Sequence, residues 1–267
     1  DVDDTNDDIT ENAQDLAPQQ PTISVNEATN GEISVEAARN MTVDTNWQVS
    51  ANSQACINVF VPKSGTTSSV TAGEENKTVT QNFDEAYSAI QNVAGTALKG
   101  TTVNWKQNNG KVINPADYIG KTIYVAVTEA GSDGTWKVKA VTSVTITKSS
   151  AQDYVKTPFT ANKAWGTVLI GASYASGTSG YELANGVTVK ANTYKWVSAS
   201  TEQPDGYTTV NSDAGKKYSL TATLVKDNKE ETGVVLGTVT ITSKTATIKS
   251  VTWEDGVKTD NNGNPTY

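Results

Sequence analysis

The chain has 267 residues, which is long enough for two domains of ordinary size, each with a sizeable core. It contains no histidine, so Ser-His-Asp and Cys-His nucleophile systems and histidine-ligated zinc or haem are excluded. The formal net charge of -8 at pH 7 argues against a nucleic-acid-binding protein, which needs Lys and Arg clustered on one face.

The remaining composition predicts an all-β protein. Thr and Val are frequent, Leu is sparse, and Gly, Asn and Asp recur at short intervals, a pattern typical of many short strands. Apolar runs stay about as short as residues 57–61, far below the roughly 18 residues of a membrane-spanning helix, so we expect no membrane insertion. The single cysteine, Cys56, lies beside that run, and we expect a buried structural thiol, because a reactive thiol needs an electropositive neighbourhood.

Residues 1–21 are acidic and poor in apolar side chains, which predicts an extended N-terminal arm. The chain begins at Asp1 with neither a methionine nor an apolar leader. We therefore expect a processed mature protein without its signal peptide, or a trimmed fragment. Few thiols, abundant Thr, Asn and Gly and an acidic balance favour a bacterial secreted or cell-surface protein.

A first domain is predicted over residues 22–149. Period-two alternation of apolar and polar residues predicts its early strands. These strands are expected at residues 22–28, 32–38 and 46–54.

An insertion is predicted in this first domain, around residues 62–95. Trp47 and Trp105 lie 27 residues further apart than Trp165 and Trp196, the pair that we match to them. The inserted stretch is polar at first and then carries an apolar stripe at helical spacing, with Asn82 as a candidate N-cap. The stripe consists of Phe83, Tyr87, Ile90 and Val93. We expect one short helix there, which either caps the first domain or binds a partner.

The second domain is predicted over residues 155–244, after a polar linker. Its strands are expected at residues 166–174, 186–198, 217–226 and 234–244. Residues 245–267 follow, either as a C-terminal strand segment or as the start of a further domain. In the second case Trp253 takes the role of Trp47 and Trp165.

One pattern occurs twice, which indicates a tandem repeat. The first copy reads VNWKQNNGK at residues 103–111, ADYIGKTIYVAV at 116–127 and VTIT at 144–147. The second reads YKWVSAS at residues 194–200, SDAGKKYSLTA at 212–222 and VTIT at 239–242. The separation from Gly120 to Val144 equals that from Gly215 to Val239, so these halves align without a gap.

These residues resemble the bacterial immunoglobulin-like (Ig-like) repeat domains of surface, adhesin, S-layer and phage tail proteins. The pattern is carried by Trp105, Asp117, Gly120 and Lys121, and again by Trp196, Asp213, Gly215 and Lys216. The resemblance covers residues 100–148 and 187–244. It implies tandem Ig-like β-sandwich domains, each built around a buried indole.

We predict no catalytic, cofactor-binding or metal-binding residues. Four pairs of adjacent acids occur, at Glu74-Glu75, Asp84-Glu85, Glu230-Glu231 and Glu254-Asp255. A glycosidase needs two carboxyl groups that face each other, whereas neighbours on a strand point to opposite sides, so solvated turn charge is the better interpretation.

Calcium stays an open alternative at two places. In the arm, five side chains fall near the ligand offsets of a calcium loop: Asp4, Asn6, Asp8, Asn12 and Asp15. Ile9 occupies the place of the required glycine, and no bidentate Glu closes the loop. A looser cluster of oxygen-bearing side chains lies near the C-terminus: Asp260, Asn261, Asn262 and Asn264.

Three tyrosines lie in loops rich in Gly, Ser or Pro: Tyr174, Tyr181 and Tyr207. In such loops aromatic rings either stack on sugar rings or cover loop backbone. Both interpretations are open at this point.

We therefore expect a non-enzymatic extracellular structural protein, an S-layer or surface-filament subunit or fragment that self-assembles through its Ig-like domains. Its expected partner is itself, with the arm or residues 245–267 adding a strand to an open sheet edge of a neighbouring copy. A surface adhesin or carbohydrate-binding module, with glycans or cell wall as the partner, is the alternative. A phage tail or decoration protein is a further one.

Overall fold

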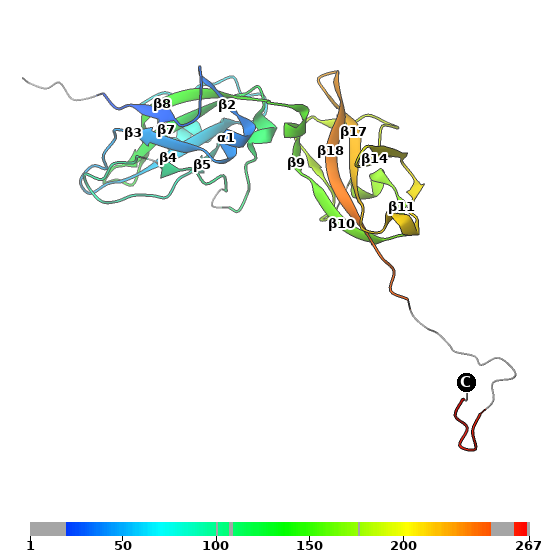
Figure 1. Ribbon diagram of the computed structural model, residues 1–267. Helices are drawn as coiled ribbons and strands as arrows, with labels where there is room; N and C mark the ends of the chain where they lie inside the picture. Colours follow the sequence, from blue (N-terminus) through cyan, green and yellow to red (C-terminus); the bar gives the residue numbers. More distant parts are fainter. Residues whose placement is uncertain (1–19, 100, 107–108, 176, 247–258, 266–267) are drawn as a thin grey trace, which may run out of the picture. The chain divides into compact units, whose positions relative to one another are not determined.

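The regular structure of the described chain is mostly β-strand, as the composition predicts. A computed structural model describes residues 20–246, except 100, 107–108 and 176, together with residues 259–265. This part of the chain contains several sheets and two short α-helices. The chain divides into two compact units between Lys156 and Thr157, here called unit 1 and unit 2 (Figure 1). Within the described residues, no helix is both long and apolar enough to cross a membrane.

The elements of unit 1 are short at first and lengthen toward its end. In chain order they are β1 (Ile23–Val25), β2 (Glu32–Ser34), α1 (Val35–Arg39), β3 (Thr42–Thr45), β4 (Gln54–Pro62), α2 (Asn76–Val79), β5 (Phe83–Tyr87), β6 (Thr101–Thr102), β7 (Thr122–Ala130) and β8 (Trp136–Thr147). Two 3-10 turns, η1 (Pro115–Tyr118) and η2 (Ala151–Tyr154), precede β7 and follow β8.

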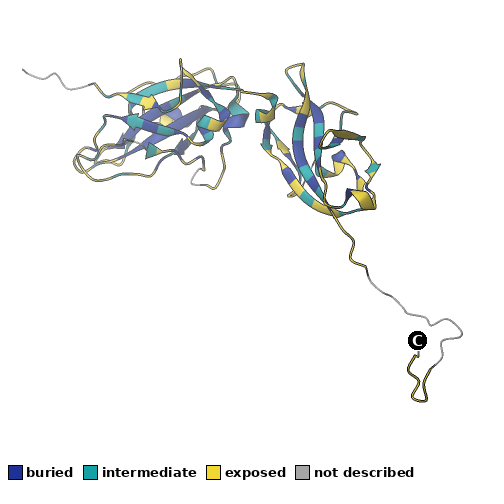
Figure 2. Cartoon of the chain, in the orientation of Figure 1, coloured by how far each residue is buried: buried dark blue, intermediate teal, exposed yellow. Residues whose placement is uncertain are grey.

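Unit 2 has a similar plan, with several two-residue strands before its long final pair. After β9 (Val155–Thr157), which lies across the boundary, come β10 (Phe159–Ala164), β11 (Val168–Leu169), η3 (Gly171–Tyr174), β12 (Glu182–Leu183), β13 (Thr188–Val189), β14 (Lys195–Ser198), β15 (Thr201–Pro204), β16 (Tyr207–Thr208), η4 (Asn211–Asp213), β17 (Lys217–Lys226) and β18 (Lys229–Thr242). Figure 2 shows that the buried residues of each unit gather on its strands.

Unit 1 contains a five-stranded sheet in the order β2-β8-β7-β4-β5 and a three-stranded sheet in the order β1-β3-β6. β2 runs parallel to β8, and the other neighbours in both sheets are antiparallel. β1 lies against β7 and β8. Apolar residues of both sheets are buried, including Val25 on β1, Val43 on β3 and Ile33 on β2. Alternation along the strands therefore gives each sheet an apolar face.

The connection between β4 and β5 contributes to a second small core of unit 1. Val70 and Val79 of this connection pack with Phe60 on β4 and Phe83 on β5. Ala126 on β7 and Val138 on β8 complete the cluster. Because this cluster adds to the main core, β4 is buried from Ala55 to Val61.

The short helix expected at residues 83–93 is wrong. Phe83 to Tyr87 form β5, which pairs antiparallel with β4 along its whole length. Ile90 and Val93, the other half of the apolar stripe, are 52% and 64% exposed. Every residue of β5 lies in register with β4, and this tertiary pairing overrides the local helical spacing. The helix of the insertion is instead α2, further upstream.

Several early strands are shorter than the alternation predicts. The strand expected at residues 32–38 ends at Ser34, whose hydroxyl accepts a hydrogen bond from the Ala37 backbone N–H and so starts α1. Residues 46–53 contain no strand, although Gln48 forms an isolated bridge. In unit 2, residues 171–174 of the strand expected at 166–174 form the 3-10 turn η3.

Unit 2 contains a main sheet in the order β10-β18-β17-β14-β15, with β13 paired to β17. β10 runs parallel to β18, as β2 does to β8. β11 and β16 form a separate antiparallel pair. Trp196 on β14 lies opposite Leu220 on β17 and is fully buried.

The Gly-Lys half of the repeat is confirmed in detail. The backbone N–H of Gly120 donates to the carbonyl of Ile146 at 2.7 Å, and that of Gly215 donates to the carbonyl of Ile241 at 2.7 Å. Both glycines have positive φ, 80° and 88°, which an L side chain rarely adopts. A 3-10 turn precedes each glycine, and an antiparallel strand pair follows it in the same register.

The tryptophan half of the repeat is confirmed for burial but wrong for position, since Trp105 and Trp196 are both buried but do not lie on equivalent strands. Trp196 lies on β14, whereas Trp105 lies outside the strands, and its indole N–H donates to the Ala38 carbonyl at 2.8 Å. The strand beside β7 in unit 1 is β4, which contains no tryptophan. A tryptophan beside a lysine therefore does not identify the strand that pairs with β7 or β17.

The tryptophan spacings also do not give the size of the insertion, because Trp47 and Trp165 are not at equivalent positions. Trp47 follows β3 and donates its indole N–H to Glu129 at 2.7 Å, whereas Trp165 precedes β11. The structure places the extra chain between β4 and β5, at residues 63–82. In unit 2, only Ala199 and Ser200 separate the corresponding strands, β14 and β15.

Trp196→Ala should lower the free energy of unfolding of unit 2 by about 3 to 5 kcal/mol, because it removes a fully buried indole. Trp165→Ala is the control, since this ring is only partly buried and stacks under the Lys244 ammonium, an interaction of about 1 kcal/mol or less. Denaturant unfolding of both variants measures the difference. A loss below about 1 kcal/mol for Trp196→Ala would contradict its place in the core.

Candidate functional site

The described part of unit 2 lacks a strand that unit 1 has. In unit 1, β3 pairs with β6 on one edge and with β1 on the other. β11 holds the position of β3 for two reasons. Each follows the parallel edge strand of its unit in the chain, β10 or β2, and each pairs with the strand that precedes a 3-10 turn, β16 or β6. In the described part of unit 2, no strand pairs with the second edge of β11.

The hydrogen bonds of β11 show which backbone groups are left on this edge. The Thr167 carbonyl accepts from Thr209 at 3.0 Å, and the Leu169 carbonyl accepts from Gly206 at 2.7 Å, so both face β16. Because backbone groups alternate sides along a strand, the N–H and C=O of Val168 point to the opposite edge. The Val168 side chain is 47% exposed. β11 therefore presents a short edge that can accept a further strand.

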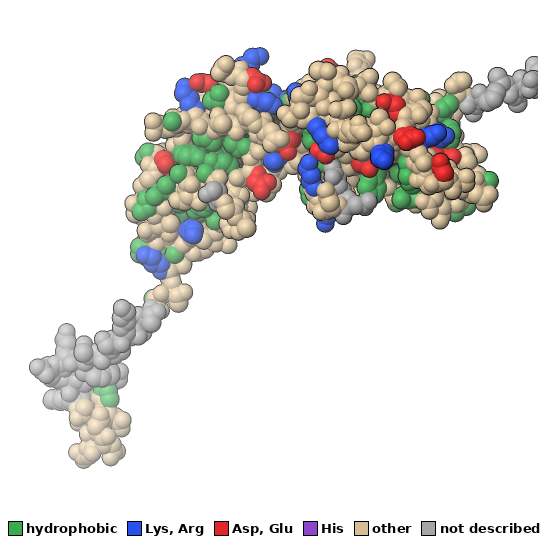
Figure 3. All heavy atoms as spheres, turned by 180° about the vertical axis from the view of Figure 1, so that it is seen from behind, with side chains coloured by type: hydrophobic (Ala, Val, Ile, Leu, Met, Phe, Trp, Pro, Cys, Tyr) green, Lys and Arg blue, Asp and Glu red, His purple; other side chains and the backbone are tan. Residues whose placement is uncertain are grey.

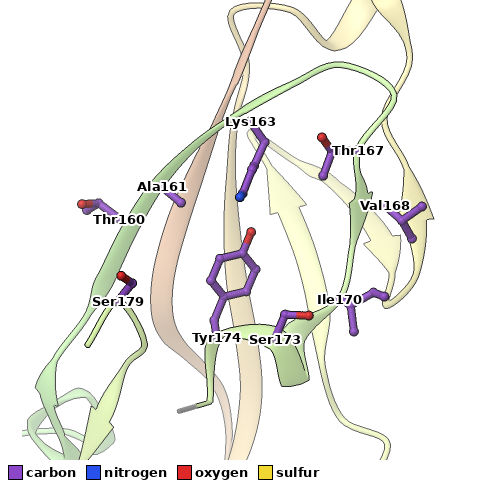
Figure 4. A pocket seen from close by; sticks show the side chains of 9 residues that line it. All are labelled: Thr160, Ala161, Lys163, Thr167, Val168, Ile170, Ser173, Tyr174 and Ser179. Atoms are coloured by element: carbon purple, nitrogen blue, oxygen red, sulfur yellow. The ribbon is translucent and has the colours of Figure 1, made fainter. Parts of the chain in front are cut away.

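A groove of about 470 Å³ opens beside this edge (Figure 4). Its walls come from β10, from β11 and from η3. The lining residues are Thr160, Ala161, Lys163, Thr167, Val168, Ile170, Ser173, Tyr174 and Ser179. The groove thus combines backbone edge, hydroxyl groups and one ammonium.

Lys163 lies on the core-facing side of β10. It pairs in register with Ile241, as Ile33 of unit 1 pairs with Ile146, so Lys163 and Ile33 are equivalent positions. Ile33 is 1% exposed, whereas Lys163 is exposed. Figure 4 shows Lys163 and Tyr174 pointing toward each other in the groove. An inward-pointing cation on an edge strand is a known device against unwanted strand pairing.

Sequence reasoning missed Lys163. The signal was present, since Phe159, Ala161 and Lys163 alternate along one strand, and the third position breaks the apolar pattern. Without the pairing to β18, however, nothing distinguishes this lysine from a surface lysine.

The three loop tyrosines do not come together as a platform. The Tyr174 ring stacks on Phe159 at 4.2 Å, and burial raises the pKa of Tyr174. Tyr181 is buried, and its hydroxyl lies 2.5 Å from that of Tyr194. Tyr207 donates to the Asp213 carboxylate at 2.8 Å. Tyr174 alone lines the groove, and the other two support loops.

Several of the adjacent acids that the structure describes act as structural partners. Asp84 pairs with Lys111 at 2.8 Å, and Glu230 pairs with Lys190 at 2.8 Å. Glu85 accepts from the Asn58 amide at 2.9 Å, and burial raises its pKa. No group of three or more metal-ligating side chains of the Asp, Glu, His or Cys type occurs among the described residues. Glu254 and Asp255 lie outside them.

Of the two places considered for calcium, the structure describes only the C-terminal cluster. The acids of the arm lie outside the described residues, and so does Trp253, which was considered as the start of a further domain. At the C-terminal cluster, the Asp260 carboxylate accepts from the backbone N–H groups of Asn262 and Asn264 at 2.8 and 2.9 Å. It also accepts from the Asn264 side-chain amide at 3.2 Å. These bonds close a turn between Thr259 and Pro265 and lower the pKa of Asp260.

Charge on the surface is mixed. In Figure 3, Lys and Arg side chains lie interspersed with Asp and Glu on both units, and the face shown has no broad basic patch. Such a surface offers no electrostatic footprint for a nucleic acid on that side.

Comparison of the sequence with the models of known protein families gave no match, and comparison with curated proteins gave none either. The assignment of the site therefore depends on its geometry.

Cys56 is buried, as the sequence predicts, and lies 3.1 Å from the Asn58 side-chain oxygen. Burial raises the pKa of this thiol to about 11. The thiolate is the reactive form, so native protein at pH 8 should not react with a thiol reagent within hours. Mass spectrometry should show modification only after denaturation. Rapid labelling of native protein would contradict the burial.

Asp213→Asn should destabilise unit 2. Burial alone would raise the pKa of Asp213, but bonds from the Val210 backbone, Lys216, Tyr218 and Tyr207 outweigh it and lower the pKa. A lowered folded-state pKa stabilises the fold above the ordinary carboxyl pKa of about 4, and this stability is lost as the pH falls.

The expected loss is about 2 kcal/mol at pH 7, where charged hydrogen bonds disappear, and clearly less at pH 3. Denaturant unfolding at both pH values measures it. Asp227→Asn, in an exposed turn, is the control and should leave stability unchanged. An equal loss at both pH values would rule out the charge as the cause.

Proposed function

We propose that this chain is a non-enzymatic extracellular structural protein that assembles with copies of itself. In this proposal it is a subunit or fragment of a surface layer or filament, and its units are Ig-like β-sandwich domains. The absence of histidine from the sequence and the buried state of Cys56 both speak against the commonest nucleophilic chemistries.

The strand order supports the Ig-like assignment. Unit 1 has two antiparallel sheets of five and three strands, with a first edge strand parallel to the last strand. Unit 2 keeps the parallel edge strand and the long strand pair β17 and β18. Its buried Trp196 lies on a central strand, as in Ig-like sandwiches.

The open edge of unit 2 is the observation that carries the assembly proposal. Unit 1 fills the position with its own β1, whereas β11 of unit 2 keeps a free edge beside a groove in the described structure. A strand added there gains main-chain hydrogen bonds with little demand on its sequence. Assembly by strand addition would complete unit 2 on the plan of unit 1.

Two deletion variants, one without residues 1–21 and one without residues 245–267, show which terminal segment donates the added strand. If the arm is the donor, the first deletion should give folded monomers while the second leaves assembly unchanged. Circular dichroism checks the fold, and light scattering with negative-stain microscopy checks the assembly. A full-length protein that stays monomeric at high concentration, or assembly that survives both deletions, would refute strand addition by the termini.

A carbohydrate-binding module is the second candidate, because hydroxyl groups of Thr160, Thr167 and Ser173 line the groove beside Tyr174. Against it, Phe159 already covers one face of the Tyr174 ring. A glycan array distinguishes the two functions, since a purely structural protein should show no saturable binding of sugars.

A further inference from the structure

We infer that the groove between β10 and β11 of one copy binds the acidic N-terminal arm, residues 1–21, of a second copy, and that Lys163 pairs with an arm carboxylate. This inference rests on the proposed self-assembly and names its acceptor and its donor.

The form of the groove favours an extended peptide. β10 is the outer strand of its sheet, and β11 has a free edge, so backbone groups flank the groove on two sides. At the same position of unit 1 lies β1, a three-residue strand. A peptide that binds here therefore needs only a few residues in extended conformation.

The charge of the groove favours an acidic peptide. Lys163 contributes an ammonium, and none of the described lining residues is Asp or Glu. A strand with an apolar side chain at this point would bury the ammonium without a partner, which is costly. A strand with a carboxylate there forms an ion pair in a partly enclosed site. Lys163 thus disfavours strands with an apolar side chain at this point and also contacts the acidic strand.

The arm has the complementary charge. Its carboxylates are Asp1, Asp3, Asp4, Asp7, Asp8, Glu11 and Asp15, and it contains neither Lys nor Arg. The other terminal segment, residues 245–267, carries both Lys and acidic residues. Charge complementarity therefore favours the arm as the donor.

One stretch of the arm combines an apolar side chain with a carboxylate at strand spacing. In extended backbone, Ile9 and Glu11 point to the same side. They would bring one apolar side chain and one carboxylate into the groove together. The arm immediately precedes β1 in the chain, and its extended length of up to roughly 70 Å allows it to reach another copy.

The first test reverses the charge of the groove in the full-length protein. Lys163→Glu should raise the concentration needed for assembly by roughly tenfold or more, since it replaces attraction by repulsion. Lys217→Glu makes the same charge change on β17, on the opposite face of the same sheet, and should leave assembly unchanged. Adding Glu11→Lys to Lys163→Glu should restore assembly, which a folding defect would not do.

The second test is disulfide cross-linking between two single variants, Ile9→Cys and Val168→Cys, of which one carries a size tag. The native Cys56 is buried and should not compete. A mixed disulfide between the two variants is expected under mild oxidation. Ser219→Cys, on the other face of the main sheet, replaces Val168→Cys as the control and should give at least about tenfold less product.

The outcomes separate this inference from the proposed function. If the protein assembles but Lys163→Glu has no effect and the groove forms no more cross-link than the control, the inference is wrong and the proposed function stands. If the full-length protein does not assemble, both are wrong. If only a double variant cross-links, within one chain, the arm occupies its own groove and the second-copy inference is overturned.

Discussion

Both units depend on one recurring backbone contact, the hydrogen bond from a turn glycine to the last strand. Gly120 bonds to Ile146 and Gly215 to Ile241, each at 2.7 Å. In return, Ile146 donates to Lys121 and Ile241 to Lys216. The bond fixes the register of the long antiparallel pair, and the pair in turn fixes which residues of the parallel edge strand face the core. Because a slip of one residue would turn every side chain to the other face, the tight turn controls the composition of the core.

Given this common register, the two units differ chiefly in how their sheets are covered. In unit 1, the β4–β5 connection adds an apolar cluster and β1 completes the smaller sheet. In unit 2, a turn of two residues replaces the connection, and no described strand replaces β1. Unit 1 consequently has a covered edge, whereas the described part of unit 2 keeps a groove of mixed polar and apolar lining where unit 1 has core. The exchange of Ile33 for Lys163 is the clearest mark of that difference.

The sequence predicted the candidate site only in part. Tyr174 was singled out as a loop aromatic, and it does line the groove, but Tyr181 and Tyr207 act in loop support. Lys163 was missed because its significance depends on pairing with Ile241, almost 80 residues away. The false helix has a simple cause. Phe83 and Tyr87 are four residues apart, a spacing that places them on one side of a helix and equally on one side of a strand.

The sequence by itself determined the β class and the Gly-Lys repeat, because positive φ at glycine and period-two alternation are demands of the local chain. It also indicated a buried thiol at Cys56 from its apolar neighbours. Tertiary structure decided which tryptophan is central, since Trp105 and Trp196 have similar sequence surroundings but different neighbours in space. Only the tertiary structure shows that Ile33 is buried and Lys163 is exposed. The burial of a residue on one strand depends on which other strand covers it, and the local sequence does not reveal that strand.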